Sequence, residues 1–413
     1  MSPITAEQMN QHRPRRPLSV FIVAGEQSGD ALGGALMAAL TSRLGGDGVT
    51  FTGVGGADMA RQGLASIFPM DDVAVMGLMS ILPVLPRIVG RVYQAVDAAV
   101  ALRPDIVIII DSPEFTHPIA KRVRRRMPGV PIVNYVSPSV WAWRPGRAKR
   151  MRGYVDHVLA LLPFEPAAHA RLGGPACTYV GHPLIERLDQ IATADGAALA
   201  RRLRLPEDRP VLLVLPGSRR SEITHLIDVF GDAVARLAEQ GDAFSVVIPA
   251  VPHVKAMIIE RTARWRVKPM IVDGADKYAA MDLARAALAA SGTVTLELAL
   301  AGTPAVVAYK VDWIMKPLRY LLNVQSVVLA NLVLGRNVYP ELLQDECTAE
   351  TLGAALMPLL RDSAERRAQL DALAKMPARM RSAGGHPSFA AADVVIGVLR
   401  DHSDGKSRRV GPT

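Results

Sequence analysis

Ten short apolar runs with helical patterns between them constrain the fold of this chain more than any other feature. The runs are 18–24, 49–54, 106–110, 131–136 and 157–161 in the first half, and 211–215, 244–249, 270–272, 286–290 and 305–309 in the second. Continuous apolar strands that alternate with helices are typical of parallel sheets covered by helices on both faces. The pattern therefore predicts an α/β fold.

A polar helical segment at 194–205 and a turn at 206–210 separate the runs into two sets of five. At 413 residues the chain is also too long for one ordinary core, so two Rossmann-like domains are expected. The predicted divisions are 17–190 for the first domain, 365–400 for C-terminal helices that complete it, 191–364 for the second domain, and 1–16 and 402–413 for flexible tails. Such domains bind ligands in a cleft that faces the carboxyl ends of the strands.

The composition argues against several classes of protein. The two cysteines, Cys177 and Cys347, have no metal or redox spacing, which favours a reducing compartment. No run reaches the roughly 18 uncharged apolar residues of a membrane-spanning helix, so a cytoplasmic protein is expected. The net charge of +9 suits an anionic membrane surface or phosphorylated substrates better than nucleic acid, because aromatic residues are sparse. The histidines form no metal-binding pattern, and no G-x-S-x-G motif supports a serine hydrolase.

The segment 23–30 joins the first predicted strand to a predicted helix at 31–40. It contains two glycines, Ser28 and the carboxylates Glu26 and Asp30, and Ser28 or Asp30 is expected to cap the helix. Its spacing matches neither the G-x-G-x-x-G motif nor a phosphate loop with its lysine. The segment therefore predicts a ligand at the end of a strand without identifying it.

Asp111 follows the buried strand 106–110 directly. A carboxylate at the mouth of such a strand is partly desolvated, which raises its pKa and suits it to accept a proton from a hydroxyl nucleophile. The alternative is that Asp111 caps the turn before Pro113. Glu26 has the same placement and is a second candidate.

In the second half, a strand runs into Gly217, Ser218 and Arg219 before the next helix. Backbone amides and a guanidinium together can bind a diphosphate. A surface turn with solvated arginines would have the same sequence pattern.

The strand 286–290 likewise ends in Ser291, Gly292 and Thr293, with Glu297 one helical turn further on. A phosphate at this helix N-terminus and sugar hydroxyls near Glu297 are expected, whereas the alternative makes Thr293 a simple cap. Two loops of this kind in one domain favour a nucleoside diphosphate.

Trp141, Trp143 and Arg144 follow another strand and precede further basic residues. Indoles beside arginines suit an amphipathic, phosphorylated acceptor, but a tryptophan pair is more often core packing. The apolar-basic segments 76–86 and 313–334 resemble interfacial helices, although helices buried between domains would look alike.

Taken together, these loops resemble the lipid-A-disaccharide synthase family of inverting glycosyltransferases, which have the GT-B fold. The matching blocks are 24–30, 74–77, 111–113, 135–144, 162–165, 181–183, 215–219, 290–293, 331–332 and 340–344, in the family's order. The most specific is Tyr135-Val136-Ser137-Pro138-Ser139-Val140-Trp141-Ala142-Trp143-Arg144. The resemblance extends from Leu18 to about Ile396.

The resemblance implies transfer of 2,3-diacylglucosamine from UDP to 2,3-diacylglucosamine 1-phosphate, which forms a β-1,6-linked disaccharide. It implies no metal and no cofactor, Asp111 as catalytic base and Arg219 as donor-phosphate ligand. Asn331 falls in a matching block, although Ala330 stands where the family has proline. Glu114 lies in a stretch that departs from the family pattern.

With the UDP site assigned to the second domain, the 23–30 segment is expected to lie on the acceptor side. Glu26 and Ser28 then become candidates for positioning the sugar, since carboxylates accept hydrogen bonds from hydroxyls but repel a diphosphate. Trp141, Arg144 and Asn331 are candidates for the same role.

Two further alternatives stay open at this point. One is another GT-B enzyme, such as a lipid II-forming N-acetylglucosaminyltransferase or a UDP-sugar epimerase. The other is a non-catalytic nucleotide- or lipid-binding protein. The expected setting is the cytoplasm, with peripheral contact to the anionic inner membrane, and the helices near 365–373 and 389–399 leave a homodimer open.

Overall fold

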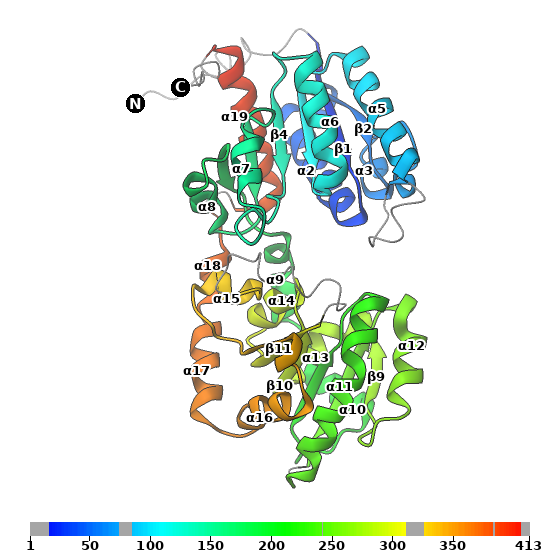
Figure 1. The fold of residues 1–413 in the computed structure, drawn as a ribbon, viewed down its shortest axis with the longest axis vertical. Helices are drawn as coiled ribbons and strands as arrows, with labels where there is room; N and C mark the ends of the chain where they lie inside the picture. Colours follow the sequence, from blue (N-terminus) through cyan, green and yellow to red (C-terminus); the bar gives the residue numbers. More distant parts are fainter. Residues whose placement is uncertain (1–15, 74–84, 242, 311–325, 383–384, 406–413) are drawn as a thin grey trace. The chain divides into compact units, whose positions relative to one another are not determined.

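The computed structural model describes residues 16–73, 85–241, 243–310, 326–382 and 385–405. These residues divide into two compact units (Figure 1). The first unit contains the chain up to Pro183 together with the part from Ser382 onward, and the second contains Leu184–Arg381.

The first unit is built on a six-stranded parallel sheet with the order β2-β1-β3-β4-β5-β6. Its strands are β1 (Leu18–Ala24), β2 (Val49–Val54), β3 (Ile106–Ile110), β4 (Ile132–Tyr135), β5 (His157–Ala160) and β6 (Ala176–Tyr179). Its helices are α2 (Gln27–Leu44), α3 (Ala57–Arg61), α5 (Leu85–Leu102), α6 (Pro113–Arg126), α7 (Gly146–Met151), α8 (Glu165–Arg171) and α19 (Pro387–Ser403).

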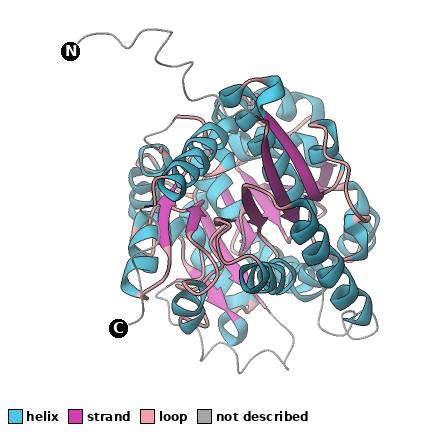
Figure 2. Ribbon diagram, turned by 90° about the horizontal axis from the view of Figure 1, so that it is seen from above, coloured by secondary structure: helices cyan, strands magenta, loops and turns pink. Residues whose placement is uncertain are grey.

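The second unit repeats this architecture with the order β12-β11-β10-β7-β8-β9. Its strands are β7 (Val211–Leu215), β8 (Ser245–Ala250), β9 (Met270–Asp273), β10 (Ala286–Ala290), β11 (Ala305–Tyr309) and β12 (Glu341–Leu343). Its helices are α9 (Leu188–Ala192), α10 (Gly196–Leu203), α11 (Arg220–Glu239), α12 (Pro252–Thr262), α13 (Lys277–Leu283), α14 (Val294–Leu300), α15 (Leu329–Leu334), α16 (Ala349–Leu360), α17 (Ala364–Leu373) and α18 (Met376–Met380). Helices lie outside the strands of each sheet (Figure 2).

Strand β3 shows why the apolar runs become central strands. Successive side chains of a strand point to opposite faces, and all five residues of β3 are buried because both faces are covered. Ile106, Ile108 and Ile110 pack in the cluster that includes residues of α2 and α19. Val107 and Ile109 pack in the cluster that includes residues of α5 and α6.

All ten predicted strands are present, with bounds that differ from the predicted ones by no more than one residue. The structure adds two strands that the apolar pattern missed, β6 and β12, which form one outer edge of each sheet. The predicted C-terminal range 365–400 spans both units, since α17 and α18 belong to the second unit whereas α19 packs against α2 in the first.

Candidate functional site

The carboxyl ends of β1 and β3 bring two predicted loops side by side in the first unit. The strands are hydrogen-bonded neighbours, with Ala24 paired to Ile110, so Gly25 and Glu26 lie beside Asp111 and Ser112. A Cβ atom on Gly25 would lie 2.8 Å from the Cβ of Ser112, closer than carbon atoms approach. Gly25 is therefore required for this contact between the loops.

Asp111 occupies a constrained position at this edge. Its φ of 49° lies in the left-handed region, and its backbone N–H donates to the Tyr135 carbonyl at 3.0 Å. Its Oδ1 accepts a hydrogen bond of 2.8 Å from the Ser112 amide. Burial, followed by the hydrogen bond and negative charge of Glu26, raises the pKa of Asp111 to about 6. Such a carboxylate is ionised at neutral pH and basic enough to take a proton.

The expectation that Ser28 or Asp30 caps the first helix is wrong. The N-cap of α2 is Glu26, and no side-chain hydrogen bond caps the helix there. Ser28 Oγ instead donates to Glu26 Oε1 at 2.8 Å, which orients that carboxylate. Asp30 is buried and accepts amide hydrogen bonds from residues at the start of α3, namely Gly56, Asp58 and Met59, at 2.7–3.1 Å. Asp30 therefore holds a loop in place.

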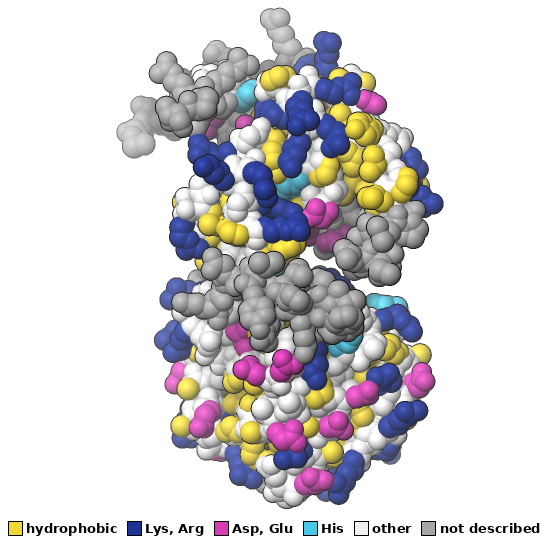
Figure 3. Space-filling model, in the orientation of Figure 1, with side chains coloured by type: hydrophobic (Ala, Val, Ile, Leu, Met, Phe, Trp, Pro, Cys, Tyr) yellow, Lys and Arg dark blue, Asp and Glu magenta, His cyan; other side chains and the backbone are white. Residues whose placement is uncertain are grey.

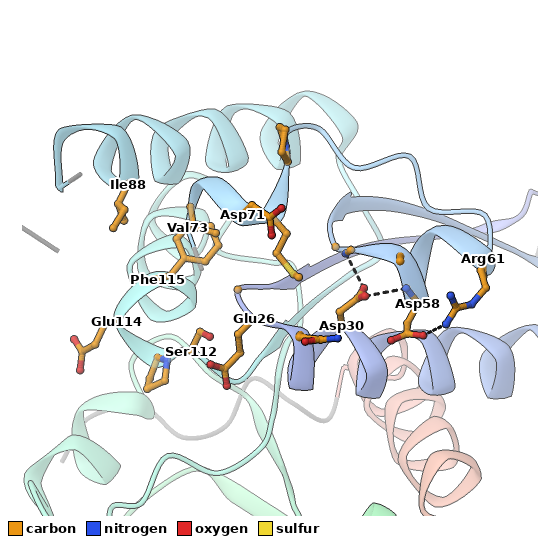
Figure 4. Close-up of a pocket in the computed structure, with 18 of the residues that line it drawn as sticks. Glu26, Asp30, Asp58, Arg61, Asp71, Val73, Ile88, Ser112, Glu114 and Phe115 are labelled. Atoms are coloured by element: carbon orange, nitrogen blue, oxygen red, sulfur yellow. Dashed lines mark hydrogen bonds and ion pairs between the residues drawn. The ribbon is translucent and has the colours of Figure 1, made fainter. Parts of the chain in front are cut away.

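A pocket of about 1210 Å³ opens at this edge, and we call it the β1–β3 pocket. Figure 4 shows Glu26, Ser112 and Glu114 along one side of it, with Val73, Ile88 and Phe115 on the other. Its remaining lining residues are Gly25, Gln27, Asp30, Gly55, Gly56, Ala57, Asp58, Arg61, Pro69, Met70, Asp71, Leu85 and Pro113. The pocket thus offers polar groups to a sugar and an apolar wall to a hydrocarbon chain.

The tryptophan-arginine segment after β4 approaches this pocket through Glu114. Arg147 Nη2 lies 2.6 Å from Glu114 Oε1, and Arg144 Nη1 lies 3.8 Å from the same oxygen. The Arg144 guanidinium stacks on the Trp143 ring at 4.3 Å. Trp141 instead contacts α8, because its Nε1–H donates to Glu165 Oε1 at 3.1 Å. Arg144 and Trp141 therefore share one loop but have different surroundings.

In the second unit, β7 and β10 are hydrogen-bonded neighbours, and a pocket of about 350 Å³ lies at their carboxyl ends. We call it the β7–β10 pocket. All seven residues predicted to bind the donor line it, namely Gly217, Ser218, Arg219, Ser291, Gly292, Thr293 and Glu297. Two loops about 75 residues apart in the sequence are thus brought together.

The backbone amides expected to clamp a diphosphate at this pocket have another partner. Glu222 Oε2 accepts hydrogen bonds from the amides of Ser218 and Arg219 at 3.1 and 3.3 Å. Glu222 Oε1 pairs with the Arg219 guanidinium at 3.0 Å, although 61% of that side chain stays exposed. Gly217, with φ 116°, allows the turn, since a Cβ there would lie 2.5 Å from Glu222 Oε2. The guanidinium is therefore the group best placed to meet an anion.

Glu297 is buried and is paired with a residue that the sequence reasoning missed. Lys277 Nζ lies 2.7 and 2.8 Å from its two carboxylate oxygens, and Tyr278 donates to Oε1 at 3.1 Å. Lys277 lines the same pocket from the start of α13. No motif marks this lysine, and its place just after the edge strand β9 was the only available signal.

Asn331 lies in the second unit, where its side-chain amide makes four hydrogen bonds. Its Oδ1 accepts from the amides of Val338 and Tyr339, and its Nδ2 donates to the Tyr339 carbonyl and to Glu341, all at 2.9 Å. It is 1% exposed. These bonds fix the loop between α15 and β12, so the side chain acts on its own chain in this structure.

Several predictions fall outside the described residues. The block 74–77 and most of the interfacial segments 76–86 and 313–334 lie there. In the described part of the chain, no cluster of three or more His, Cys, Asp or Glu side chains could hold a metal ion. Within the same part, no helix is both long and apolar enough to cross a bilayer.

Comparison with known proteins gives one family. Residues 20–385 match the model of the lipid-A-disaccharide synthetase family. The chain is 51% identical over 394 residues to the lipid-A-disaccharide synthase of Bradyrhizobium diazoefficiens, covering 95% of this chain and 99% of that protein. It is 53% identical over 385 residues to the enzyme of that name from Rhodopseudomonas palustris strain BisB18, covering 92% and 95%.

Solved structures share the fold at lower identity. Acinetobacter baumannii MurG matches with a TM-score of 0.57 at 16% identity, covering 92% of this chain and all of that one. The UDP-GlcNAc 2-epimerase from Neisseria meningitidis, solved with UDP-GlcNAc bound, matches with a TM-score of 0.54 at 13% identity, covering 94% and 100%. These likenesses establish the GT-B architecture of two parallel-sheet units.

Proposed function

The chain belongs to the lipid-A-disaccharide synthase family, and from that premise we propose which substrates it joins and which residues act on them. It is a glycosyltransferase of the GT-B fold. The proposed donor is UDP-2,3-diacylglucosamine and the proposed acceptor is 2,3-diacylglucosamine 1-phosphate. The products are the β-1,6-linked disaccharide 1-phosphate and UDP.

The contrast between the two pockets carries this proposal. The β1–β3 pocket combines carboxylates with an apolar wall, which suits an acylated sugar and disfavours a diphosphate. The β7–β10 pocket combines Arg219 and Lys277 with hydroxyl groups and Glu297, which suits a nucleoside diphosphate. Acceptor and donor are therefore assigned to the first and second units, respectively.

In the proposed reaction, the 6-hydroxyl of the acceptor attacks the anomeric carbon of the donor. Asp111 takes the hydroxyl proton as the new bond forms, and its raised pKa suits that transfer. The bond from the anomeric carbon to the diphosphate breaks, and UDP leaves with its negative charge stabilised by Arg219. Glu26, held by Ser28, is placed to accept hydrogen bonds from the acceptor's hydroxyls.

Mass spectrometry of the product made from defined substrates tests this assignment. We expect a tetra-acylated disaccharide monophosphate and one UDP per coupling event when both acylated substrates are supplied. An epimerase would instead act on UDP-N-acetylglucosamine without any lipid, and a lipid II-forming enzyme would require a lipid-linked muramyl acceptor. Activity on either of those substrates, with none on the acylated pair, would refute the proposal.

We further propose that the first unit contacts the anionic cytoplasmic face of the inner membrane, which would hold the acyl chains of the proposed substrates. The first half of α5 exposes an apolar stripe at helical spacing, with Leu85 46%, Val89 44% and Tyr93 50% exposed. Figure 3 shows apolar side chains over this helix beside Lys and Arg side chains over α6 and α7. On α6, Lys121 and Arg125 are exposed. Apolar insertion beside cations favours anionic lipid.

Replacing Leu85, Val89 and Tyr93 with serine should weaken binding to vesicles that contain phosphatidylglycerol by roughly 10- to 100-fold, because apolar area is no longer buried. Co-sedimentation with vesicles measures this. The matched control is Ile259→Ser, which removes an equally exposed apolar side chain from α12 in the second unit. Equal loss in both variants, or no loss in the triple variant, would contradict the assignment of this surface.

A further inference from the structure

A buried polar cluster lies behind the loop that joins β4 to α7. At its centre is Glu165, the first residue of α8, which is 3% exposed. Its Oε1 accepts the hydrogen bond from Trp141, and its Oε2 accepts from the amides of Leu161 and Leu162 at 3.1 and 2.9 Å. The nearby Ser137 hydroxyl lowers the pKa of this carboxyl group. Glu165 therefore ties the loop, through Trp141, to the backbone that follows β5.

His169 fixes the direction of the Ser137 hydroxyl. Burial lowers the pKa of His169 to about 4, so the ring is neutral and carries one N–H. Its Nε2 lies 2.8 Å from Ser137 Oγ, whereas its buried Nδ1 has no hydrogen-bond partner among the described residues. A buried N–H without a hydrogen-bond partner costs more free energy than a buried acceptor nitrogen without one. Because only Nε2 has a partner, we assign the proton to Nε2 and leave Nδ1 as the unpaired acceptor. Ser137 then accepts from His169, and its hydroxyl donates to the Pro138 carbonyl at 3.2 Å.

The loop held in this way carries the cations beside the β1–β3 pocket. Residues 137–145 lead from Ser137 through Trp141 to Arg144, and Arg147 follows in the first turn of α7. Both arginines lie against Glu114, which lines the pocket. Trp141 also packs edge-on against Phe164, with ring centroids 5.1 Å apart, so the indole is fixed by both packing and hydrogen bonding.

We propose that Glu165 is a positioning residue for the acceptor. By holding Trp141, while His169 of the same helix holds Ser137, it fixes the loop 137–145 and so places Arg144 and Arg147 to bind the acceptor's phosphate. This inference rests on the proposed function, because it takes the phosphorylated sugar as the occupant of the β1–β3 pocket. Glu165 itself touches neither substrate.

The titration of Glu165 provides a readout that does not depend on activity. Burial raises the pKa of Glu165 to about 7, even though its hydrogen-bond donors favour the ionised form. The neighbouring titratable groups are His169, with its lowered pKa, and two residues of β6. Burial raises the pKa of the Cys177 thiol, and that of Tyr179 to about 12. In this cluster, Glu165 is therefore the group that changes charge near pH 7.

The decisive variant is Glu165→Gln, which keeps the shape of the side chain but replaces one of two acceptor oxygens with an NH₂ donor. We expect the KM for the phosphorylated acceptor to rise roughly tenfold or more, the range for a lost hydrogen bond to a charged group. The donor KM and kcat should stay within about twofold. With an acylated acceptor that lacks the phosphate, the variant and the wild type should differ little. The control is Asp47→Asn, which neutralises an exposed carboxylate of the same unit.

NMR of the indole N–H of Trp141 supplies the second measurement. In the wild type this resonance should titrate with a midpoint near 7, and in Glu165→Gln the titration should vanish. If Glu165→Gln does not fold, Trp141→Phe removes the indole N–H while keeping an aromatic ring against Phe164, and it should also raise the acceptor KM. An unchanged acceptor KM in a folded variant, or equal losses for acceptor and donor, would overturn the inference. Failure of the wild type to couple the acylated substrates would instead overturn the proposed function.

Discussion

Asp111→Asn should lower kcat by roughly 10²–10⁴-fold, the loss typical of a missing general base. Asparagine keeps the shape of the side chain and an oxygen to accept the Ser112 amide, so the loop should stay in place. Binding of UDP should therefore persist, which calorimetry can measure. The control is Asp208→Asn, which neutralises an exposed carboxylate in a turn of the second unit. A rate within about threefold of the wild type would remove Asp111 from the role of base.

The pH dependence of the same reaction follows from the position of Asp111 beside Glu26. Because the base must be ionised, kcat/KM for the acceptor should rise with pH and level off above a midpoint near 6. Glu26→Gln removes the charge that helps to raise the pKa of Asp111, so the midpoint should move to lower pH.

The contribution of Asp111 to the free energy of unfolding should fall as pH rises, whereas the activity rises. A carboxyl group whose pKa is raised on folding, here from 3.8 to about 6, contributes stability that is fully present below pH 3.8 and lost as pH rises through 6. Asp111→Asn avoids the burial of that charge and should be more stable than the wild type at pH 8, by up to about 3 kcal/mol. Chemical denaturation at pH 4 and pH 8 measures the difference. A less stable variant at pH 8 would show that the burial of Asp111 is compensated in the folded protein.

The sequence predicted the fold well because burial on both faces leaves a strong signal. Central strands such as β3 are uninterrupted apolar runs, and every one of the ten predicted strands is present. The two missed strands lack that signal for a physical reason. Strand β6 lies at a sheet edge with no fully buried residue, and β12 has only three residues. Edge position and short length remove the hydrophobic pattern on which the prediction depends.

For the candidate site, the sequence predicted which loops meet but not which side chains pair. Loops at the carboxyl ends of neighbouring strands were expected to meet, and the residues after β7 and β10 do line one pocket. Side-chain partners across long sequence distances carry no local pattern, so the Lys277 pair with Glu297 and the role of Glu165 were not foreseen. The capping error at Asp30 has the same origin, because its three amide partners lie 26–29 residues away.

Arg219→Met should lower kcat/KM for the donor by roughly 10²–10³-fold, because it removes the cation that would stabilise charge on the departing UDP. Methionine keeps much of the length and apolar stem of the side chain. Glu222 would keep its hydrogen bonds to the amides of Ser218 and Arg219, so the loop and the melting temperature should change little. Steady-state kinetics with the donor varied, together with calorimetric titration of UDP, measures the loss.

Arg220→Met is the matched control, since Arg220 is the next residue and is also exposed but does not line the β7–β10 pocket. Its kcat/KM should stay within about twofold of the wild type. The kcat/KM of Arg219→Lys should lie between those of Arg219→Met and Arg220→Met. The lysine ammonium supplies the charge but lacks the planar guanidinium that binds two phosphate oxygens at once. If the Arg219 and Arg220 variants lose the same activity, the effect comes from the general positive charge of the loop and not from a directed contact. A loss confined to Arg219, and only partly restored by lysine, is the result that a diphosphate ligand in this pocket requires.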